Sequence, residues 1–434
     1  MKNRIKTIIA VTGVLLLIST AIALYSGQQQ VMALGEGRGG YEHISTFAEV
    51  LSILTTSYVK EVDTKELIEG AINGMLETLD PHSAYLTPEN FKELQIDTKG
   101  EFGGLGIEIT IKDKLLTIVS PIEDTPAHQA GIKAGDIIIK IDEELTRDMS
   151  LTDAVNKMRG KPGTSITLTI IRKDASQPIA INITRDIIKI KSVTYEIIGG
   201  DIGYVKLKKF INHSDRDLVG ALNKFKEAKV SGIILDLRNN PGGLLTQAVS
   251  VTNQFVKKGQ LIVYTKGRAK EQDQRYIAEH DGLFTEGPMI VLVNAGSASA
   301  SEIVAGALQD TKRAIILGET SFGKGSVQTV IPLSDSSGLK LTTALYYTPN
   351  DRVIQGEGII PDIVVVEEKT EIAAKEENKT PNHLREKDLN NYIKKDKKGT
   401  VKEKEKGYSA DGDIVKERAV ALLKSWKIFK TNKN

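Results

Sequence analysis

Short apolar runs alternate with helical stretches from residue 202 to 366, and this alternation constrains the fold more than any other feature of the chain. The sequence stretches "IGYVKLKKF", "VSGIILDLRNN", "MIVLVN" and "AIILGE" are typical of strands, and "DLVGALNKFKEA" and "SASASEIVAGALQD" are typical of helices. Elements of this kind must bury their apolar faces against one another, which favours helices layered on a sheet. The sequence therefore predicts a layered α/β core over residues 189–366.

Other parts of the chain differ from this core in residue pattern and composition, so the sequence predicts a multidomain protein. Apolar residues recur at three- and four-residue steps from Ile44 to Leu94, as in helices. Short strands and turns follow from Gly100 to Arg185, and after Glu367 lysine and glutamate interleave with almost no aromatics, as in a solvated, mobile segment. Besides the core, we expect an N-terminal helical region, a β-rich domain, a charged flexible segment and a C-terminal helix, at residues 40–97, 98–188, 367–406 and 407–434.

The chain contains no cysteine, and this excludes whole classes of function. Without thiols there is no disulfide, no thiolate metal site and no cysteine nucleophile. The six histidines occur in no metal-ligand spacing, so we expect no metal ion and no other cofactor. The formal net charge of +2 gives no case for the concentrated basic surface that nucleic-acid-binding proteins usually carry.

The N-terminus has the pattern of an export signal. Three basic residues, Lys2, Arg4 and Lys6, precede an apolar or small-residue run from Ile8 to Tyr25. This run approaches the length of a membrane span, so residues 1–33 are expected to be either a removed signal or a retained anchor. Because the basic side stays in the cytoplasm, both alternatives place the bulk of the chain in the periplasm, the second one anchored to the inner membrane.

The segment "GETSFGKGS", residues 318–326, nearly matches a phosphate-binding loop. Two glycines and Lys324 have the G-x-x-x-x-G-K spacing, but the next position, which must supply a hydroxyl for Mg²⁺, is Gly325. An exported protein also meets little ATP. We therefore interpret Lys324 as a buried base and not as a phosphate ligand.

A serine-rich turn precedes a predicted helix in "VNAGSASASEIVAGALQD", residues 293–310. Ser299 and Glu302 stand in S-x-x-E relation at the helix start, which by itself is typical of an ordinary capping box. A serine at this place also has free N–H groups and the positive end of the helix dipole nearby, which suit an oxyanion. No G-x-S-x-G elbow surrounds it and no histidine lies in the neighbouring motifs, so a Ser-His-Asp triad has no second member.

A lysine is able to take the place of the histidine, as it does in Ser-Lys variants of the triad. A lysine with the ordinary pKa of about 10.4 is almost always charged at pH 7, so burial must lower its pKa. If a strand begins at Lys324, then Lys324, Ser326 and Gln328 point to one face, and Gln328 is placed to hydrogen-bond the lysine amine. The sequence thus predicts a Ser-Lys pair with a glutamine that orients the lysine.

The segment from residue 98 to 188 resembles a PDZ domain. The resemblance rests on "GGLGI" at residues 103–107, on Pro126-Ala127 and on "AGIKAGD" at residues 130–136. In such a domain a Gly-rich turn exposes backbone N–H groups to a chain-terminal carboxylate, and an edge strand takes up the peptide by β-augmentation. A tight turn without a ligand is the alternative. The resemblance implies a peptide-binding site at Gly103, Gly104, Leu105, Gly106 and Ile107.

Three motifs of the core resemble those of the carboxyl-terminal processing proteases, also called tail-specific proteases. "DLRNNPGG", "SASASE" and "FGKGSVQ" match that family in its order, and the series of domains matches it as well. The resemblance implies a serine protease core of the ClpP/crotonase type and an endopeptidase that cleaves exported proteins near their C-termini. It also implies a nucleophile, a general base, a positioning partner and two oxyanion N–H donors, at Ser299, Lys324, Gln328, Ala300 and Gly243. From the residues alone, Ser297 and Ser301 remain open alternatives to Ser299.

Arg159 in "KMRGKPGT" is a candidate regulatory residue. It follows a predicted short helix beside the peptide groove and precedes a glycine turn toward the next module. The resemblance implies that it reports occupancy of the PDZ domain to the protease core, so that the PDZ domain gates the site. A solvated turn arginine is the alternative.

The expected partners follow from the same resemblance and from the apolar stripes at the two ends of the chain. They are the C-terminal tails of exported substrates, a second copy of the chain in a homodimer, and a regulatory adaptor. A function of a different class remains as the alternative: a catalytically inactive PDZ-containing adaptor or ligand-binding protein.

Overall fold

The computed structural model describes residues 38–366, 384–394 and 413–431. The export signal or anchor expected at residues 1–33 lies outside these ranges. By their contacts, the residues form two compact units, 1–75 and 76–434. Among the described residues, no helix combines the length and the apolar content that a membrane span requires.

The first unit contains helix α2 (Arg38–Ser57) and most of helix α3 (Thr64–Glu77). The Asp63 carboxylate caps α3, because its Oδ1 accepts the N–H of Lys65 at 2.7 Å. Helices therefore occupy this region, as the three- and four-residue spacing predicts. Several large apolar side chains of α2 are exposed, namely Ile44, Phe47, Val50, Ile53 and Leu54.

The β-rich domain consists of antiparallel strands and two short helices. In chain order these are β2 (Glu101–Gly104), β3 (Ile107–Lys112), β4 (Leu115–Pro121), α5 (Pro126–Gln129), β5 (Ile137–Ile141), β6 (Glu144–Leu145), α6 (Leu151–Met158), β7 (Ser165–Ile171), β8 (Ile179–Thr184) and β9 (Asp186–Lys189). The main sheet has the order β3-β4-β5-β7-β8, with β6 beside β5, and β2 pairs separately with β9. Within the described strands, β3 pairs with β4 alone, so it is an edge strand.

The central sheet of the core is mostly parallel. Its strands are β10 (Val193–Ile198), β11 (Ile202–Leu207), β12 (Gly232–Asp236), β15 (Met289–Val293), β16 (Ile315–Gly318) and β19 (Ile363–Val364), side by side in that order. All neighbours are parallel except β10 and β11. The carboxyl ends of β12, β15 and β16 therefore lie at one edge, where ligands bind in open α/β sheets.

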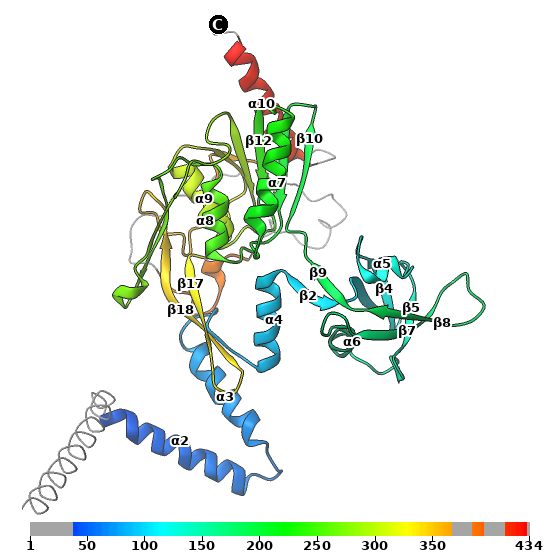
Figure 1. Ribbon diagram of the computed structural model, residues 1–434. Coiled ribbons are helices and arrows are strands. Elements are labelled where there is room, and N and C mark those ends of the chain that lie inside the picture. Colours follow the sequence, from blue (N-terminus) through cyan, green and yellow to red (C-terminus); the bar gives the residue numbers. More distant parts are fainter. Residues whose placement is uncertain (1–37, 367–383, 395–412, 432–434) are drawn as a thin grey trace, which may run out of the picture. The chain divides into compact units, whose positions relative to one another are not determined.

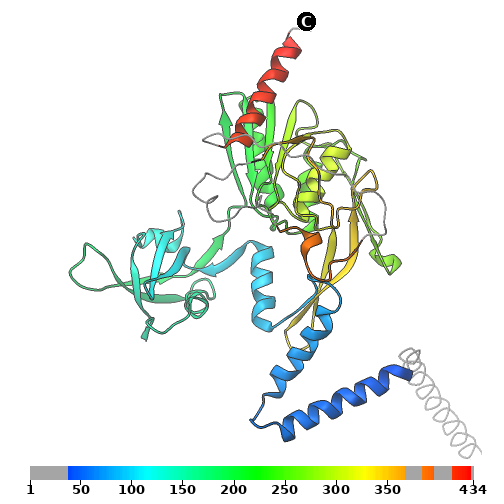
Figure 2. The same ribbon diagram turned by 180° about the vertical axis from the view of Figure 1, so that it is seen from behind.

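Helices cover both faces of this sheet, as Figures 1 and 2 show. Helices α7 (Ser214–Glu227), α8 (Leu245–Asn253) and α9 (Ala300–Asp310) share one face, and α10 (Ile414–Thr431) packs on the other. Successive strand residues face opposite sides. Leu235 and Val291 accordingly pack with α7 to α9, whereas Ile234 and Leu292 pack with α10. The layered α/β core predicted from the sequence is confirmed.

A second, antiparallel sheet stands beside the first. It consists of β1 (Ala84–Leu86), β13 (Leu261–Gly267), β14 (Arg275–Ile277), β17 (Ser326–Pro332) and β18 (Gly338–Tyr347), and β18 pairs with β1, β13 and β17. Helix α4 (Pro88–Lys99) follows β1, and short 3-10 turns occur at η1 (Lys270–Gln272) and η2 (Glu386–Asp388). The N-terminal region, which we expected to be helical, thus also supplies strand β1 to this sheet. The sequence does not predict β1, because three residues are too few to leave a periodic pattern.

Candidate active site

Three turns meet at the carboxyl edge of the parallel sheet. They follow β12, β15 and β16 and contain the motifs "NNPGG", "SASAS" and "FGKG". The Ala298 N–H donates to the Asn240 carbonyl at 3.0 Å, which joins the first two turns. The Phe322 N–H donates to the Ser297 carbonyl at 3.0 Å, which joins the second and third. The structure therefore brings together motifs that the sequence places far apart.

The structure separates the three serines that the sequence leaves equivalent. Ser297 and Ser301 are fully buried. Their hydroxyls donate to the carbonyls of Leu237 and Asn240, at 2.8 and 2.9 Å. Ser299 is partly exposed, and its hydroxyl makes no cap hydrogen bond to α9. Of the described serines in this turn, Ser299 alone has a hydroxyl that is not used to hold the fold.

The backbone of Ser299 is strained. Its φ of 54° and ψ of −110° lie outside the regions that a residue with a side chain readily adopts, the left-handed helical region included. The strain is held by the surrounding structure, since α9 begins at Ala300 and the Ser299 N–H donates to the Glu302 carboxylate at 2.8 Å. Strain of this kind clusters at functional sites, which motivates the assignment of a function to Ser299.

The glycine turn after β12 lies directly against Ser299. A Cβ added to Gly242 would lie 2.9 Å from the Ala300 nitrogen and 2.9 Å from the Ser299 Cβ. Within the described part of the chain, the N–H groups of Ala300 and Gly243 have no hydrogen-bond acceptor. Two such donors beside a serine hydroxyl form an arrangement that is able to bind an oxyanion.

The loop that carries Lys324 has its N–H groups bonded inside the protein. From Phe322 to Gly325, the four acceptors are in order the Ser297 carbonyl, Oε1 of Glu302, Oε2 of Glu302 and the side-chain oxygen of Gln355. A phosphate-binding loop presents such N–H groups to the phosphate. None of these four is left for that purpose, so the geometry supports the interpretation of Lys324 as something other than a phosphate ligand.

Glu302 belongs to this site, although the sequence predicts only a helix-capping role for it. Its side chain is fully buried, and its Oε2 accepts the N–H of Ser299 at 2.8 Å and that of Lys324 at 2.9 Å. The two backbone nitrogens are therefore no farther apart than the sum of these distances. The S-x-x-E spacing is the signal for this residue, but a capping box accounts only for its bond to Ser299.

The Lys324 amine lies in surroundings that favour its neutral form. Burial lowers the pKa of Lys324, and the neighbouring positive charge of Lys340 lowers this pKa further. The carboxylates of Glu386, Asp80 and Glu302 act in the opposite direction, but the net change is downward. Among the described residues, the amine makes no hydrogen bond or ion pair that would stabilise the ammonium directly.

Gln328 does not contact Lys324 in the way that the sequence predicts. Strand β17 begins at Ser326 and not at Lys324, and the N–H groups of Lys324 and Gly325 bond the side chains of Glu302 and Gln355. The Gln328 amide nitrogen donates to the hydroxyls of Ser326 and Thr342, at 2.9 and 3.3 Å. Ser326 and Gln328 thus share a face, but the expected bond from Gln328 to the lysine amine is absent from the described contacts.

Part of the charged stretch that we expected to be mobile is docked behind the lysine loop. Within residues 384–394, Glu386 is fully buried. Its Oε1 accepts the Gln355 amide at 2.7 Å, and its Oε2 lies 2.7 Å from Nε2 of His82. Gln355 in turn bonds the lysine loop. The sequence does not indicate this contact, because one buried glutamate among exposed charges leaves no pattern.

Comparisons with known proteins agree with this arrangement. The chain matches the models of Peptidase family S41 at residues 201–365, of the PDZ domain at residues 117–172 and of the "Activating protease CtpB N-terminal domain" at residues 20–90. A carboxy-terminal-processing protease of Bartonella bacilliformis is 50% identical over 364 residues, which cover 83% of this chain and 82% of that protein. This chain belongs to peptidase family S41.

Other relatives extend over almost the whole S41 chain. A probable CtpA-like serine protease of Staphylococcus epidermidis is 36% identical over 427 residues, which cover 97% of this chain and 83% of that protein. Among solved structures, the photosystem II D1 C-terminal processing protease is 31% identical, with a TM-score of 0.44, and the match covers 73% of this chain and 92% of that one. By the family models and the sequence relatives, the chain is a serine protease of the carboxyl-terminal processing type with a PDZ domain, as the sequence motifs predicted.

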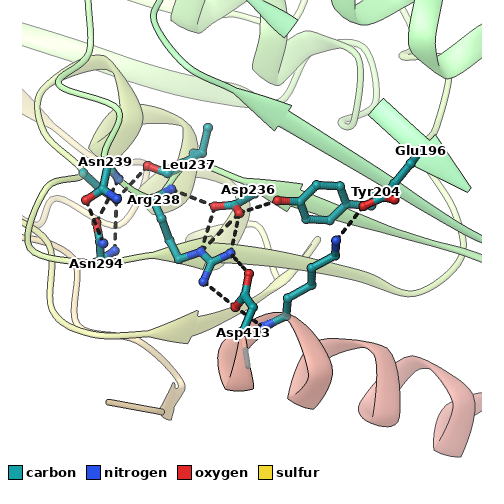
Figure 3. Close-up of polar contacts among 10 residues, drawn as sticks. Glu196, Tyr204, Asp236, Leu237, Arg238, Asn239, Asn294 and Asp413 are labelled. Atoms are coloured by element: carbon teal, nitrogen blue, oxygen red, sulfur yellow. Dashed lines mark hydrogen bonds and ion pairs between the residues drawn. The ribbon is translucent and has the colours of Figure 1, made fainter. Parts of the chain in front are cut away.

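The C-terminal helix of this S41 peptidase is anchored to the strand end that leads into the glycine turn (Figure 3). The Arg238 guanidinium donates to both carboxylate oxygens of Asp413, at 2.7 Å each, and also to the buried Asp236. The N–H of Asn239 donates to Asn294 Oδ1 at 2.9 Å, and the Asn294 amide donates back to Asn239 Oδ1 at 3.0 Å. The turns after β12 and β15 are thus fastened to each other, and the first of them to α10.

The PDZ residues that the sequence singles out lie in two strands and the link between them. Gly103 and Gly104 belong to β2 and pair with β9, so the expected Gly-rich turn is shorter than predicted. Leu105 and Gly106 make the connection, with Gly106 at a φ of 79° that favours glycine. Ile107 begins β3, whose free edge is what β-augmentation requires.

Arg159 lies where the PDZ helix α6 ends and contacts two other elements of the S41 chain. Its guanidinium forms an ion pair with Glu93 of α4 and stands 5.0 Å from the ring centroid of Phe102 in β2. The next residue, Gly160, donates its N–H to the Gly103 carbonyl at 3.1 Å. Arg159 is therefore not a solvated turn arginine.

Helix α4 continues this set of contacts into the protease core. Asp97 of α4 pairs with Lys209 at 3.0 Å. Lys209 directly precedes Phe210, whose N–H donates to the Gly242 carbonyl at 2.9 Å. A contiguous series of contacts thus leads from Arg159 through α4 to the glycine turn beside Ser299.

Proposed function

We propose that this S41 protease is a Ser-Lys endopeptidase that cleaves exported proteins near their C-termini. One observation carries the proposal: in the serine turn, only Ser299 has a hydroxyl that does not hold the fold, and its backbone shares one acceptor oxygen with that of Lys324. A nucleophile and its base must be held close together for the proton to pass between them. The shared acceptor oxygen holds the two backbones close together, which supports this pairing.

The proposed reaction needs one nucleophile, one base and two donors. The neutral Lys324 amine takes the proton of the Ser299 hydroxyl while Oγ attacks the scissile carbonyl carbon. The N–H groups of Gly243 and Ala300 stabilise the resulting oxyanion. The Lys324 ammonium then gives its proton to the leaving amine as the C–N bond breaks. Water hydrolyses the acyl ester in the same way, and Lys324 returns one proton to Ser299.

We assign Gln328 a positioning role in this reaction. Its amide nitrogen is occupied by the hydroxyls of Ser326 and Thr342, which orients the side chain. Its carbonyl oxygen has no partner among the described residues. We propose that this oxygen accepts a hydrogen of the Lys324 amine in the substrate complex, so that the amine lone pair faces Ser299.

The proposed substrates are the C-terminal tails of proteins outside the cytoplasm. The free edge of β3 supports uptake of an extended tail as an added strand. The basic and apolar N-terminal pattern supports export to the periplasm. The exposed apolar side chains of α2 support a homodimer, because large exposed apolar patches mark interfaces.

Mass spectrometry of model peptides tests the proposed function. Matched peptides with free and amidated C-termini would be incubated with the wild-type protein and with Ser299→Ala. We expect internal cleavage by the wild type, faster for the free C-terminus, and no products with the variant. Products from Ser299→Ala would contradict the nucleophile, and equal rates for the two peptides would contradict tail recognition.

Replacement of Lys340 by glutamine is expected to move the acid limb of the activity profile to higher pH. The limb arises because only the neutral Lys324 amine accepts the serine proton. Removal of the Lys340 charge removes a cause that lowers the pKa of Lys324 and leaves Glu386, Asp80 and Glu302, which raise this pKa. The measurement is kcat/KM against pH for wild type and variant. A limb that stays in place or moves to lower pH would contradict the assignment of Lys324 as the base.

Replacement of Arg159 by alanine is expected to reduce the preference for a free C-terminus by about tenfold, within the range typical of coupling between sites. The variant breaks the contacts of Arg159 with Glu93 and Phe102, through which we propose that the PDZ domain acts on the core. The measurement is the ratio of kcat/KM for the free and the amidated peptide. Lys157→Ala is the matched control, since Lys157 of the same helix pairs with Glu144 inside the PDZ domain. An unchanged ratio in Arg159→Ala would leave the PDZ domain as a passive tether.

A further inference from the structure

One buried carboxylate joins the serine turn to the lysine loop. Oε2 of Glu302 accepts the N–H groups of Ser299 and Lys324, at 2.8 and 2.9 Å. Oε1 accepts the N–H of Gly323 at 2.7 Å and the hydroxyl of Ser321 at 2.5 Å. The side chain is fully buried, so it has no contact with a substrate.

The four contacts suit an ionised carboxylate. Each of its oxygens accepts two hydrogen bonds, and three of the four donors are backbone N–H groups, which are unable to accept a proton in return. Burial raises the pKa of Glu302 to about 7, against these hydrogen bonds, which lower it. A carboxylate that is buried at this cost, next to the reacting residues, calls for a function beyond the capping of α9.

We propose that Glu302 is the positioning residue of the dyad, and that it holds the backbones of the nucleophile and the base in register through one carboxylate. The inference rests on the proposed Ser-Lys mechanism and adds to it a residue that touches neither substrate nor reacting atoms. Glu302 fixes the positions of Ser299 and Lys324 at the same time, because both N–H groups bond the same oxygen. A shift of either one therefore weakens the hold on the other.

The variant Glu302→Gln tests the proposal. The amide has the same shape, but its NH₂ group replaces one acceptor and must face at least one backbone N–H, donor against donor. We expect kcat to fall by about 100-fold, the size of effect that a displacement of about 1 Å produces, with KM unchanged. Loss of the negative charge also lowers the pKa of Lys324, so the acid limb of kcat/KM is expected to move to lower pH.

Two further variants separate position from charge. Glu302→Asp keeps the charge but shortens the side chain, so kcat is expected to fall with no downward shift of the acid limb. Glu386→Gln removes another fully buried charge that raises the pKa of Lys324 but bonds neither Ser299 nor Lys324. This control is expected to shift the limb and to lose far less kcat than Glu302→Gln. If either Glu302 variant folds and keeps kcat within about threefold of wild type, or changes KM and not kcat, the proposal is overturned.

Hydrogen exchange on the wild-type protein tests the hydrogen bonds from Glu302 to the two backbones. This test needs no substitution and does not depend on the chemistry of the dyad. The amides of Ser299, Gly323 and Lys324 are bonded to a buried carboxylate and are expected to exchange slowly. The amides of Ala300 and Gly243, which have no acceptor within the described residues, serve as internal references and are expected to exchange faster. Fast exchange at Ser299 or Lys324 would overturn the proposal even if Ser299 and Lys324 prove essential.

Discussion

Replacement of Ser299 by alanine is expected to lower kcat by about 10⁶-fold and to leave the fold intact, because a nucleophile and its base fail as a unit. The hydroxyl makes no cap hydrogen bond to α9, so its removal costs the folded state little. The measurements are peptide cleavage by mass spectrometry and thermal unfolding by circular dichroism. The unfolding midpoint is expected to stay close to that of the wild type.

The neighbouring serines provide matched controls for this experiment. Ser297→Ala and Ser301→Ala each remove a buried hydroxyl that donates to a carbonyl. Each is expected to lower the free energy of unfolding by about 1 kcal/mol and to retain measurable turnover. Loss of all turnover in one of these variants, together with full turnover in Ser299→Ala, would transfer the nucleophile assignment to that serine.

Replacement of Lys324 by arginine is expected to abolish turnover as completely as replacement by alanine. The guanidinium stays protonated at any pH at which the protein is folded, so it has no lone pair to take the serine proton. Lys324→Arg retains the positive charge. The variant would therefore keep turnover if the site needed only a cation beside the oxyanion, and loses turnover if the site needs a base. The measurement is the rate of peptide cleavage from pH 6 to about 10, across the range in which lysine amines lose their proton.

Two outcomes would contradict the assignment of Lys324 as the base. Substantial turnover by Lys324→Arg would mean that the residue acts by its charge. Turnover by Lys324→Ala close to the wild-type rate at pH 7 would mean that another group takes the proton. Lys340→Gln is the control here, because it removes a neighbouring lysine charge and is expected to keep a working site with a shifted acid limb.

Much of the architecture and of the candidate site was predictable because the signals are local. The strands and helices of the core follow from apolar periodicity over six to fourteen residues, and the PDZ motif follows from glycines and apolar residues in a fixed order. The three core motifs are recognisable as short runs, and "SASASE" at a helix start identifies a turn with free N–H groups. Parallel strands then bring their carboxyl ends to one edge, which joins the three turns.

Some predictions were wrong where contacts between residues far apart in the sequence override the local pattern. A strand that begins at Lys324 would place Gln328 beside the lysine amine, but β17 begins only at Ser326, and the N–H groups of Lys324 and Gly325 bond the side chains of Glu302 and Gln355. Gln328 accordingly bonds Ser326 and Thr342 and not the lysine amine. The sequence predicts that the charged segment at residues 367–406 is solvated, but Glu386 in this segment is fully buried.

The sequence by itself determined the type of each domain, the family and the short list of residues able to carry the chemistry, since these depend on neighbours along the chain. Only the tertiary structure decided which of three equivalent serines has an uncommitted hydroxyl, and which carboxylate connects the serine to the lysine. The bond from Lys324 to Glu302 spans 22 positions, and that between His82 and Glu386 spans 304. Hydrogen bonds between such distant residues are satisfied only when the chain is folded, so no local pattern of residue types encodes them.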